Sequence, residues 1–452
     1  MRMRRLLPLF LLPGLLTAAQ ANPYETTLKN GLRVIVKEDR RAPTAAQMVW
    51  YRIGSMDEVD GASGVAHVLE HMMFKGTPSV GPGEFNKRVA AAGGRDNAFT
   101  SRDYTAYFQQ VPKEKLPEMM QLEADRMRHL NVDPKEFAQE IKVVMEERRM
   151  RTDDNPQSKL FEQMNAVAFQ AHPYRRPIIG WMNDLENMSA ADAKAWYDTW
   201  YVPNNAYVVI TGDVDHKEVF ALAEKYYGGL EGRALPARKP QTEPAQDGTR
   251  RVNVKAPAEL PVLIMAYKAP VLRDADKDSD PYALEMLAAI LDGHDAARFN
   301  KKLVREDKVA LSIGVSYDST GRGPGMIYLH GSPSEGRTVA DLEAALRAEI
   351  TRIQQDGVSE QELKRAKAQL VAGQVYKLDS MFGQAMEIGQ TESAGIPYQK
   401  IDRMLEKLQQ VSAAEVRAAA KKYFNDDTLT IGVLEPQPLD GKPRRAAVAT
   451  RH

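Results

Sequence analysis

The first half of the chain alternates between strand-like and helix-like hydrophobic patterns. Asn30-Gly31 lies between two apolar stretches, which is a strong signal for a β-hairpin. Apolar residues over 45–55, 104–111 and 207–210 predict further strands, and 64–74 predicts a short helix. Because these elements do not follow a regular β-α-β alternation, we expect a mixed α+β fold with many antiparallel strand pairs.

The same order of elements returns in the second half. Residues 251–257 and 260–270 predict strands, and 280–293 predicts a helix in the place that 64–74 takes in the first half. This ordering suggests that one structural unit occurs twice in the chain.

A pair of long helical patterns supports the repeat. The pattern that starts at Leu122 resembles the one that starts at Leu342, and aligning Val132 with Val358 gives a period of about 226 residues. Chance resemblance between amphipathic helices is the alternative. We predict two homologous domains.

The segment between the halves has the composition of a linker. Residues 230–250 are rich in Pro, Gly and charge and lack apolar periodicity. We therefore predict a first domain over 22–235, a linker over 236–250, a second domain over 251–440 and a tail over 441–452.

The N-terminus has the pattern of a secretory signal peptide. A basic start is followed by the apolar run Leu6–Leu16 and by Ala19-Gln20-Ala21, a small-x-small cleavage pattern. We predict a signal peptide over 1–21, cleaved after Ala21. The apolar run is short for a membrane span, so no stable anchor is expected after cleavage, and a retained anchor is the alternative.

Composition narrows the function classes. The 452 residues are 43% hydrophobic and 27% charged with zero net charge, so we expect more than one domain and no nucleic-acid partner. The chain has no cysteine, which excludes disulfides and thiolate chemistry. A transition metal would depend on His and carboxylate ligands. With the signal peptide, these features predict a bacterial periplasmic protein.

The sequence HVLEH carries the strongest chemical signal. His67 and His71 are four residues apart and lie on one face of a helix, where both imidazoles can bind one Zn²⁺ ion. Glu70 precedes the second histidine, as in the H-x-x-E-H arrangement in which the glutamate acts as general base. Two surface histidines on an ordinary helix are the alternative, but the neighbouring residues are apolar, and buried polar groups need partners.

A catalytic zinc site needs a third protein ligand. Glu140 and Glu147 are seven residues apart and share a helix face, whereas Glu146 is rotated by about 100°. A solvated charged face explains these glutamates equally well. In the second-half helix, however, Ala366 and Gly373 take the places of Glu140 and Glu147, and the helix over 280–293 has no histidine. This joint loss favours one zinc ion per chain with Glu147 as ligand and Glu140 orienting a ligand histidine.

The remaining histidines lack ligand spacing, and we expect structural or surface roles for His129, His172, His216, His294 and His330, with His452 in the tail.

With these motifs, the chain resembles the M16 (pitrilysin-like) zinc metallopeptidases over nearly the whole mature sequence. The likeness includes GVAHVLEHMMFKGT, AAGGRDNAFTSRDYTAY, EERRMRTDDNP, AHPYRRPIIG and WYVPNNAYVVITGDVD. The resemblance implies two homologous domains, each a mostly antiparallel sheet covered by helices, that form a clamshell. It also implies zinc held by His67, His71 and Glu147, with Glu70 as catalytic base and Glu140 in support.

The resemblance assigns a substrate role to GGRDNAFTS. In relatives this segment forms an exposed edge strand that pairs with the substrate backbone, a form of β-augmentation. Asn97, Ala98 and Phe99 would then lie beside the cleaved bond. Without the resemblance, a glycine turn followed by a structural strand explains the segment equally well.

One feature departs from the family pattern. Active relatives carry an Arg and a Tyr seven residues apart in the second domain, and these groups help to polarise the substrate carbonyl. The matching positions here are Val304 and Leu311, and a register shifted by one gives Arg305 and Ser312. Neither register restores the pair.

The missing pair predicts a two-chain enzyme. We expect a paralogous subunit of the same fold that carries the Arg/Tyr pair, while a homodimer with Tyr317 or Arg298 as substitute is the alternative. The predicted function is that of a periplasmic zinc-dependent endopeptidase acting on peptides or unfolded segments. A non-catalytic assembly subunit and a metal-binding protein of the same fold are the rival interpretations.

Overall fold

The computed structural model describes residues 22–439. The predicted signal peptide (1–21) and tail (441–452) lie outside the described residues. Within 22–439, no helix combines the length and apolar character needed to cross a bilayer.

The first domain is built on a six-stranded sheet with the order β1-β2-β6-β3-β5-β4. Only β2 and β6 pair in parallel. The predicted hairpin at Asn30-Gly31 is confirmed, because β1 and β2 are antiparallel and Gly31 has a φ of 89°. The strands are β1 (Tyr24–Thr27), β2 (Arg33–Glu38), β3 (Thr44–Tyr51), β4 (Arg95–Thr100), β5 (Thr105–Pro112) and β6 (Ala206–Gly212).

The second domain repeats this topology in a five-stranded sheet with the order β7-β11-β8-β10-β9. Here β7 and β11 form the parallel pair, as β2 and β6 do in the first sheet. The predicted pair of homologous, mostly antiparallel domains is therefore confirmed. The strands are β7 (Arg250–Pro257), β8 (Val262–Ala269), β9 (Ala310–Tyr317), β10 (Gly325–Pro333) and β11 (Leu429–Gln437).

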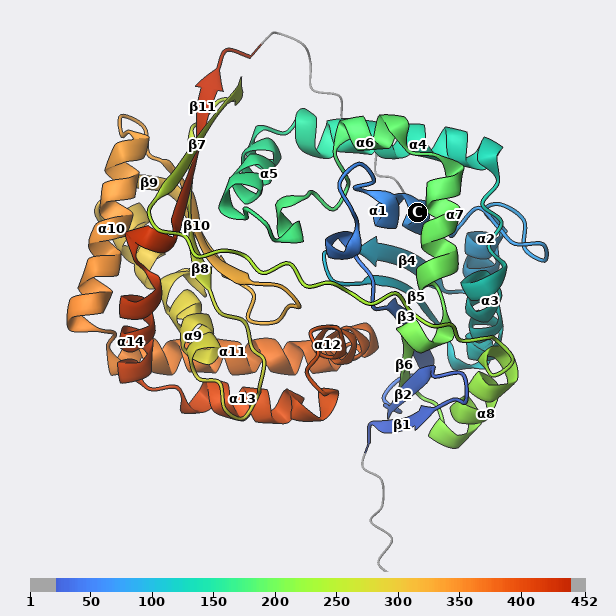
Figure 1. Cartoon of the computed structure of the whole chain (residues 1–452). Helices are drawn as coiled ribbons and strands as arrows, with labels where there is room; N and C mark the ends of the chain where they lie inside the picture. Colours follow the sequence, from blue (N-terminus) through green and yellow to red (C-terminus); the bar gives the residue numbers. More distant parts are fainter. Residues whose placement is uncertain (1–21, 440–452) are drawn as a thin grey trace, which may run out of the picture.

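Helices cover both sheets (Figure 1). Those of the first domain are α1 (Val65–Met72), α2 (Glu84–Ala91), α3 (Leu116–His129), α4 (Pro134–Arg148), α5 (Pro156–Ala168), α6 (Met182–Asn187), α7 (Ala190–Trp200) and α8 (His216–Tyr227). Those of the second are α9 (Asp280–Asp292), α10 (Val339–Asp356), α11 (Glu360–Asp379), α12 (Met381–Ser393), α13 (Ile401–Gln410) and α14 (Ala413–Tyr423). Besides short 3-10 helices, the described residues include two π-helical segments, η3 (Arg149–Asp153) and η6 (Asn300–Glu306).

The helix caps reproduce the repeat found in the sequence. Helix α4 begins after the N-cap Asp133, whose side chain accepts two backbone N–H groups, and α11 begins after the N-cap Ser359. The two caps lie directly after Val132 and Val358, the residues that the sequence comparison aligned. The register of about 226 residues between these helices is therefore confirmed.

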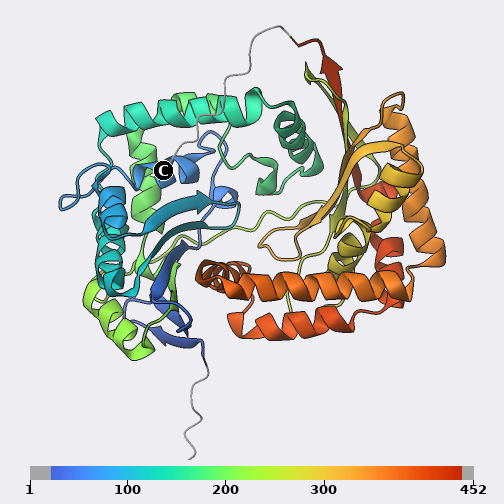
Figure 2. The ribbon, with the colours of Figure 1, turned by 180° about the vertical axis from the view of Figure 1, so that it is seen from behind.

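The two domains exchange helices. Helix α5 leaves the first domain and packs on the second sheet, where Leu160 and Met164 join the same buried cluster as Ile264. Helix α12 leaves the second domain and packs on the first sheet, where Ile388 lies against Trp50. Figures 1 and 2 show the two helices crossing between the domains, which face each other as a clamshell.

Because of this exchange, the central strand β3 is buried on both faces. Its own helices cover one face and α12 covers the other, which explains why 45–51 is almost continuously apolar. Polar contacts fix α12 in place: the Tyr207 hydroxyl donates to the carbonyl of Gly389 at 2.7 Å, and the Thr211 hydroxyl donates to that of Met381 at 2.6 Å.

Residues 228–249, which include the predicted linker, contain no helix or strand. Glu243 in this segment accepts the backbone N–H groups of 170–172 and forms an ion pair with Lys268 at 2.8 Å. The segment therefore ties the end of α5 to the second sheet.

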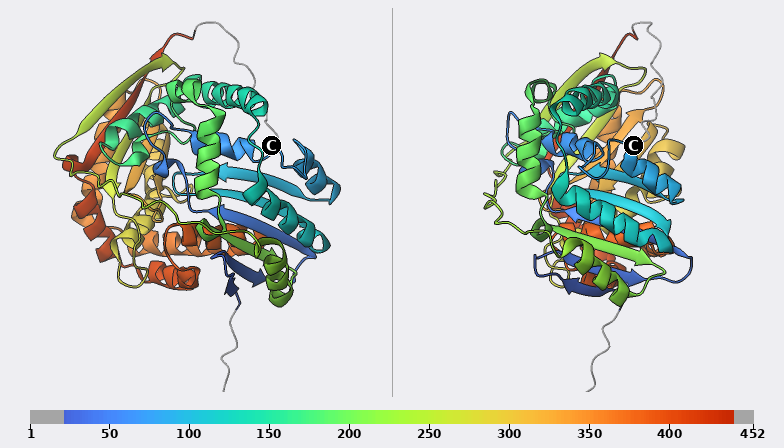
Figure 3. Two further views of the ribbon diagram at one scale, coloured as in Figure 1. Left: turned by 45° about the vertical axis from the view of Figure 1, so that its right-hand side comes forward. Right: turned by 90° about the vertical axis from the view of Figure 1, so that its right-hand side faces the viewer.

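In the right-hand view of Figure 3, the first domain lies in front of the second.

The close approach of α12 to the first sheet can be tested at Gly389. A Cβ atom there would overlap with the indole ring of Trp50, which is fully buried and cannot move aside cheaply. We expect Gly389→Ala to lower the free energy of unfolding by about 1–3 kcal/mol, measured by urea denaturation. The control is Gly373→Ala in α11, where a Cβ meets nothing within 4 Å. This change should raise stability by about 0.5–1 kcal/mol, and equal effects of both changes would contradict the packing.

Candidate metal centre

The N-terminus of helix α1 is held in place by a glycine N-cap and by a buried glutamate. The N-cap Gly64 has a φ of 90°, and a Cβ there would lie 2.7 Å from the carbonyl oxygen of Ile179. The buried carboxylate of Glu58 accepts the N–H groups of Gly64 and Ala66, each at 2.9 Å. A carboxylate at this end also complements the helix dipole. The chain can therefore bring α1 close to residues 179–180 only with glycine at position 64.

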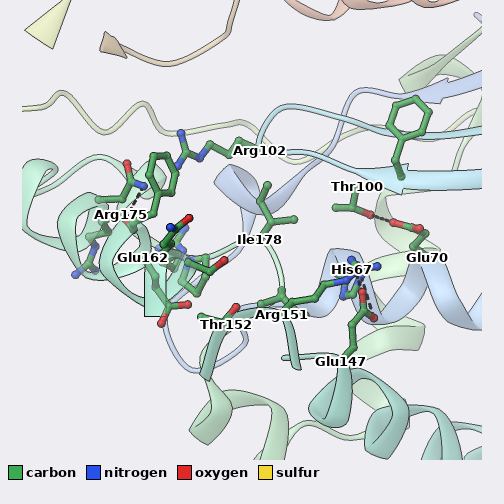
Figure 4. Close-up of a pocket in the computed structure, with 18 of the residues that line it drawn as sticks. His67, Glu70, Thr100, Arg102, Glu147, Arg151, Thr152, Glu162, Arg175 and Ile178 are labelled. Carbon is green, nitrogen blue, oxygen red and sulfur yellow. Dashed lines mark hydrogen bonds and ion pairs between the residues drawn. The ribbon is translucent and has the colours of Figure 1, made fainter. Parts of the chain in front are cut away.

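Three buried side chains converge between α1 and α4. Oε2 of Glu147 lies 3.3 Å from Nε2 of His71 and 3.9 Å from Nε2 of His67. One ligand atom from each of the three lies within 4.8 Å of the other two. The structure thus brings the three predicted ligands together, as Figure 4 shows for His67 and Glu147.

Glu140 holds the far side of His71. Its Oε1 lies 2.9 Å from Nδ1 of His71, and Lys75 forms an ion pair with Oε2. Burial lowers the pKa of His71, but the carboxylates of Glu140 and Glu147 outweigh it and raise the pKa to about 9. Because Nδ1 is engaged, Nε2 is the atom that faces Glu147.

Glu147 has basic side chains on both sides of its carboxylate. Arg151, one turn further along the chain in η3, forms an ion pair with Oε1. Burial raises the pKa of Glu147, but His71, His67 and Arg151 together lower it to about 2. The adjacent Glu146 is half exposed and pairs with Arg149 at 3.2 Å, away from this cluster.

Glu70 lies beside the cluster and has its own partner. The hydroxyl of Thr100, the last residue of β4, donates to Oε2 of Glu70 at 2.5 Å. Burial raises the pKa of Glu70 above its ordinary value, against the opposing effect of this hydrogen bond. A carboxylate with a raised pKa next to a cavity is suited to accept and return a proton.

His67, Glu70, His71 and Glu147 line a cavity of about 790 Å³ between the two domains. Asn97, Ala98 and Phe99 of β4 form part of its wall. Among the described strands, β4 pairs with β5 alone and ends the sheet, so its other edge pairs with no strand. The backbone N–H of Ala98 donates to Oδ1 of the neighbouring Asn97 at 2.8 Å.

The donor set fits zinc. Two imidazole nitrogens and one carboxylate oxygen, all on buried side chains, match the ligand chemistry of catalytic zinc sites. Oε2 of Glu147 is buried and faces Nε2 of both histidines, as expected of an oxygen placed to bind a cation together with them.

A second group of possible ligands, Glu38, Asp215 and His216, has a structural explanation. Oε1 of Glu38 accepts a hydrogen bond from the backbone N–H of His216 and lies 2.7 Å from Nδ1 of the same residue. Asp215 is the N-cap residue of α8. These three residues are only partly buried, and we assign them no metal role.

The second domain contains a remnant of the site. In α9, Glu285 accepts a hydrogen bond from the hydroxyl of Ser319, which lies just after the end of β9. In the same way, Glu70 of α1 accepts a hydrogen bond from Thr100 at the end of β4. This pairing aligns Tyr282 and Met286 with the two histidines. Glu285 was not predicted as a counterpart of Glu70, although it lies in the helical pattern over 280–293 that matches 64–74.

The proposed substitutes for the Arg/Tyr pair are engaged elsewhere. Arg298 forms an ion pair with Glu362 at 2.7 Å, and the hydroxyl of Tyr317 donates to the carbonyl of Pro270 at 2.6 Å. Val304 packs on the core of the second domain, and Leu311 is exposed. None of the four residues lines the cavity beside His67, His71 and Glu147.

His172 is a buried structural residue rather than a ligand. Its Nδ1 accepts the backbone N–H of Tyr174 at 3.2 Å, which requires the neutral imidazole. Burial, together with Arg102, Arg176 and Lys268, lowers the pKa of His172 to about 4 against the opposing effect of Glu243.

Comparison with known sequences gives a consistent result for both domains. A family profile described as "Insulinase (Peptidase family M16)" matches residues 33–181, and one described as "Peptidase M16 inactive domain" matches residues 187–370. The chain is 31% identical over 420 residues to the zinc protease PqqE of Helicobacter pylori, covering 91% of this chain and 92% of that protein. It is 25% identical to the uncharacterized zinc protease YmxG of Bacillus subtilis, covering 89% and 95%.

Solved structures share the fold. A protease from Helicobacter pylori superposes with a TM-score of 0.87 at 29% identity, covering 91% of this chain and 99% of that one. The periplasmic protease PqqL of Escherichia coli superposes with a TM-score of 0.77 at 19% identity. That match covers 92% of this chain but only 47% of PqqL, so this chain corresponds in fold to about half of PqqL.

The environment of His172 makes stability depend on pH. The folded state keeps the imidazole neutral down to about pH 4, whereas the unfolded chain takes up the proton near the ordinary value of 6.5. The free energy of unfolding should therefore fall between pH 6.5 and 4, by at most about 3 kcal/mol from this residue. Urea denaturation at several pH values, with a chelator present, measures the effect. His172→Asn keeps a capping acceptor and should flatten this pH dependence, and an unchanged slope would contradict the assignment.

Proposed function

Because the chain belongs to peptidase family M16, we propose that it is a zinc-dependent endopeptidase acting on peptides or unfolded segments. The observation that carries the proposal is the convergence of His67, His71 and Glu147 on one cavity wall with Glu70 beside them. The names of the relatives as zinc proteases agree with it.

His67, His71 and Glu147 would hold one zinc ion. When bound, zinc polarises a carbonyl group and makes water a usable nucleophile near neutral pH. Glu140 positions His71 through Nδ1, and Arg151 holds the oxygen of Glu147 that faces away from the histidines. These two contacts orient the ligands before the ion arrives.

Glu70 is the proposed general base. Its Oε2 is held by Thr100, so the carboxylate keeps one orientation while its other oxygen remains available for proton transfer. It would accept the proton of the attacking water and deliver it to the leaving amine. Because burial raises the pKa of Glu70, its carboxylate is a stronger base than that of an exposed glutamate, which assists the first of these steps.

The free edge of β4 is the proposed binding strand. An extended peptide that pairs with Asn97, Ala98 and Phe99 would be recognised through its main chain and would pass Glu70, which is tied to the end of this strand. This mode suits polypeptides that are already unfolded, because only an extended segment can add to a sheet edge.

We further propose that the enzyme works in the periplasm and pairs with a second subunit. The predicted signal peptide over 1–21 supports the location. The correspondence in fold to half of PqqL, a periplasmic protease, supports both the location and the pairing. Val304 and Leu311 cannot donate hydrogen bonds to a developing oxyanion, so a paralogue with the Arg/Tyr pair would complete the site. A homodimer is the alternative.

The role of Glu70 is tested with Glu70→Gln. Removing the base while keeping the side-chain shape should lower peptide hydrolysis by about 10²–10⁴-fold. Zinc content, measured by plasma mass spectrometry, should stay at one ion per chain. Glu146→Gln, an exposed change on α4 beside Glu147, is the matched control and should retain activity. Full hydrolysis by the Glu70 variant would remove Glu70 from the mechanism.

The pairing is tested by adding the paralogue. We expect the purified chain to bind zinc but to hydrolyse a mixed peptide library slowly, and a paralogous subunit to raise the rate by about 10²–10³-fold through the missing donors. Light scattering during size-exclusion chromatography measures the assembly. A strictly monomeric preparation that turns over as fast as the mixture would contradict the two-chain proposal.

A further inference from the structure

The charged side chains on the wall of the metal cavity are unevenly distributed. Four arginines contribute to the wall: Arg102, Arg151, Arg175 and Arg176. Only three acidic residues do so, and two of them, Glu70 and Glu147, belong to the proposed catalytic machinery. Figure 4 shows Arg102 and Arg175 at the end of the cavity opposite Glu70 and Glu147.

The third acid, Glu162, is already paired with a residue outside the cavity wall. Arg148 donates to both of its carboxylate oxygens, at 2.8 and 2.9 Å, in a bidentate ion pair. Glu162 therefore adds little negative charge at the arginine-rich end of the cavity.

Arg102 is the cation with the fewest partners at that end. It follows Thr100, the end of the proposed binding strand, by two residues, and its guanidinium lies over the ring of Tyr174 at 4.9 Å. Within residues 22–439, no carboxylate forms an ion pair with Arg102. Its hydrogen-bond donors next to the cavity have no protein carboxylate to bind.

The two neighbouring arginines share one carboxylate. Arg175 and Arg176 both contact Asp60, at 2.5 and 3.0 Å, and Arg176 also donates to the backbone carbonyl of Glu58. Two guanidinium groups against one exposed aspartate leave an excess of positive charge beside Arg102. The lowered pKa of the nearby His172, to which Arg102 and Arg176 contribute after burial, agrees with this excess.

From this arrangement we infer that the end of the cavity formed by Arg102, Arg175 and Arg176 is a subsite for a carboxylate of the peptide substrate. The inference rests on the proposed peptidase function and specifies its substrate class. In a partly buried site, an arginine–carboxylate contact is charge-assisted and can be bidentate, so it discriminates strongly against a neutral or basic group. The carboxylate can come from an acidic side chain near the cleaved bond or from the C-terminus of a short peptide.

Binding to the Glu70→Gln chain, with its partner subunit if one is required, tests the inference without cleavage. The probes are fluorescent peptides of one sequence that carry Glu, Gln or Lys at successive positions, each with a free or amidated C-terminus. We expect the best Glu peptide to bind about tenfold or more tightly than its Gln counterpart. An effect of Glu placement identifies a side-chain carboxylate, and an effect of amidation alone identifies the C-terminus.

Charge reversal locates the subsite. Arg102→Glu should abolish the preference for the carboxylate and favour the Lys peptide, whereas Arg102→Gln should abolish the preference without reversing it. Arg337→Glu, an exposed change in the loop before α10 and outside the cavity wall, has the same change in charge and should leave the preference intact. Thermal unfolding and binding of the Gln peptide check that each variant is folded.

The outcomes separate the two proposals. If Glu and Gln peptides bind equally to the chain with Arg102 intact, or if Arg102→Glu keeps the preference, the carboxylate subsite is overturned whatever the activity. If the preference follows Arg102 but the chain with Glu70 intact hydrolyses no peptide even with its partner, the subsite stands as a binding site and the peptidase function fails.

Discussion

The structure depends on the contact between α1 and α4, where ionisable side chains are buried among apolar ones. Charged groups are costly to bury unless each has a partner. Here the partners form a continuous chain from Lys75 through Glu140 and His71 to Glu147 and Arg151. The angle and register of the two helices are therefore set by side-chain chemistry as well as by packing, and no member of the chain can be removed without leaving a neighbour uncompensated.

The second domain shows that the fold does not require this chain of charges. The same sheet order and the same helix pair recur there, with Met286, Ala366 and Gly373 in place of His71, Glu140 and Glu147. Met286 and Ala366 are fully buried, whereas a Cβ at Gly373 would meet nothing within 4 Å, so the same helix pair forms without these charges. The Glu285–Ser319 pair matches the Glu70–Thr100 pair of the first domain, and Glu285 accepts its hydrogen bond from a neutral hydroxyl.

Local sequence patterns were sufficient for the hairpin at Asn30-Gly31, the main strands and helices, and the proximity of His67 and His71. The spacing of seven residues from Glu140 distinguished Glu147 from Glu146, and the comparison between the halves favoured a metal ligand over a solvated charged face. The contact of Thr100 with Glu70, the Glu58 cap of α1 and the exchange of α5 and α12 were not predictable. Each depends on segments distant in sequence meeting in the folded chain, and hydrophobic periodicity carries no information about which segments meet.

The exchange of helices also fixes the electrical environment of the cavity. The second domain contributes Val262, Ile264, Ser316, Tyr328 and His330 to the wall, and burial lowers the pKa of His330, so this side is uncharged near neutral pH. The carboxylates and arginines that line the cavity all come from the first domain. Because a protein wall without charged groups lowers the local dielectric constant, it strengthens the interactions of a substrate with Glu70 and Arg102 across the cavity. A domain without ligands of its own thereby contributes to the chemistry of the other, provided that α5 and α12 keep the two sheets facing each other.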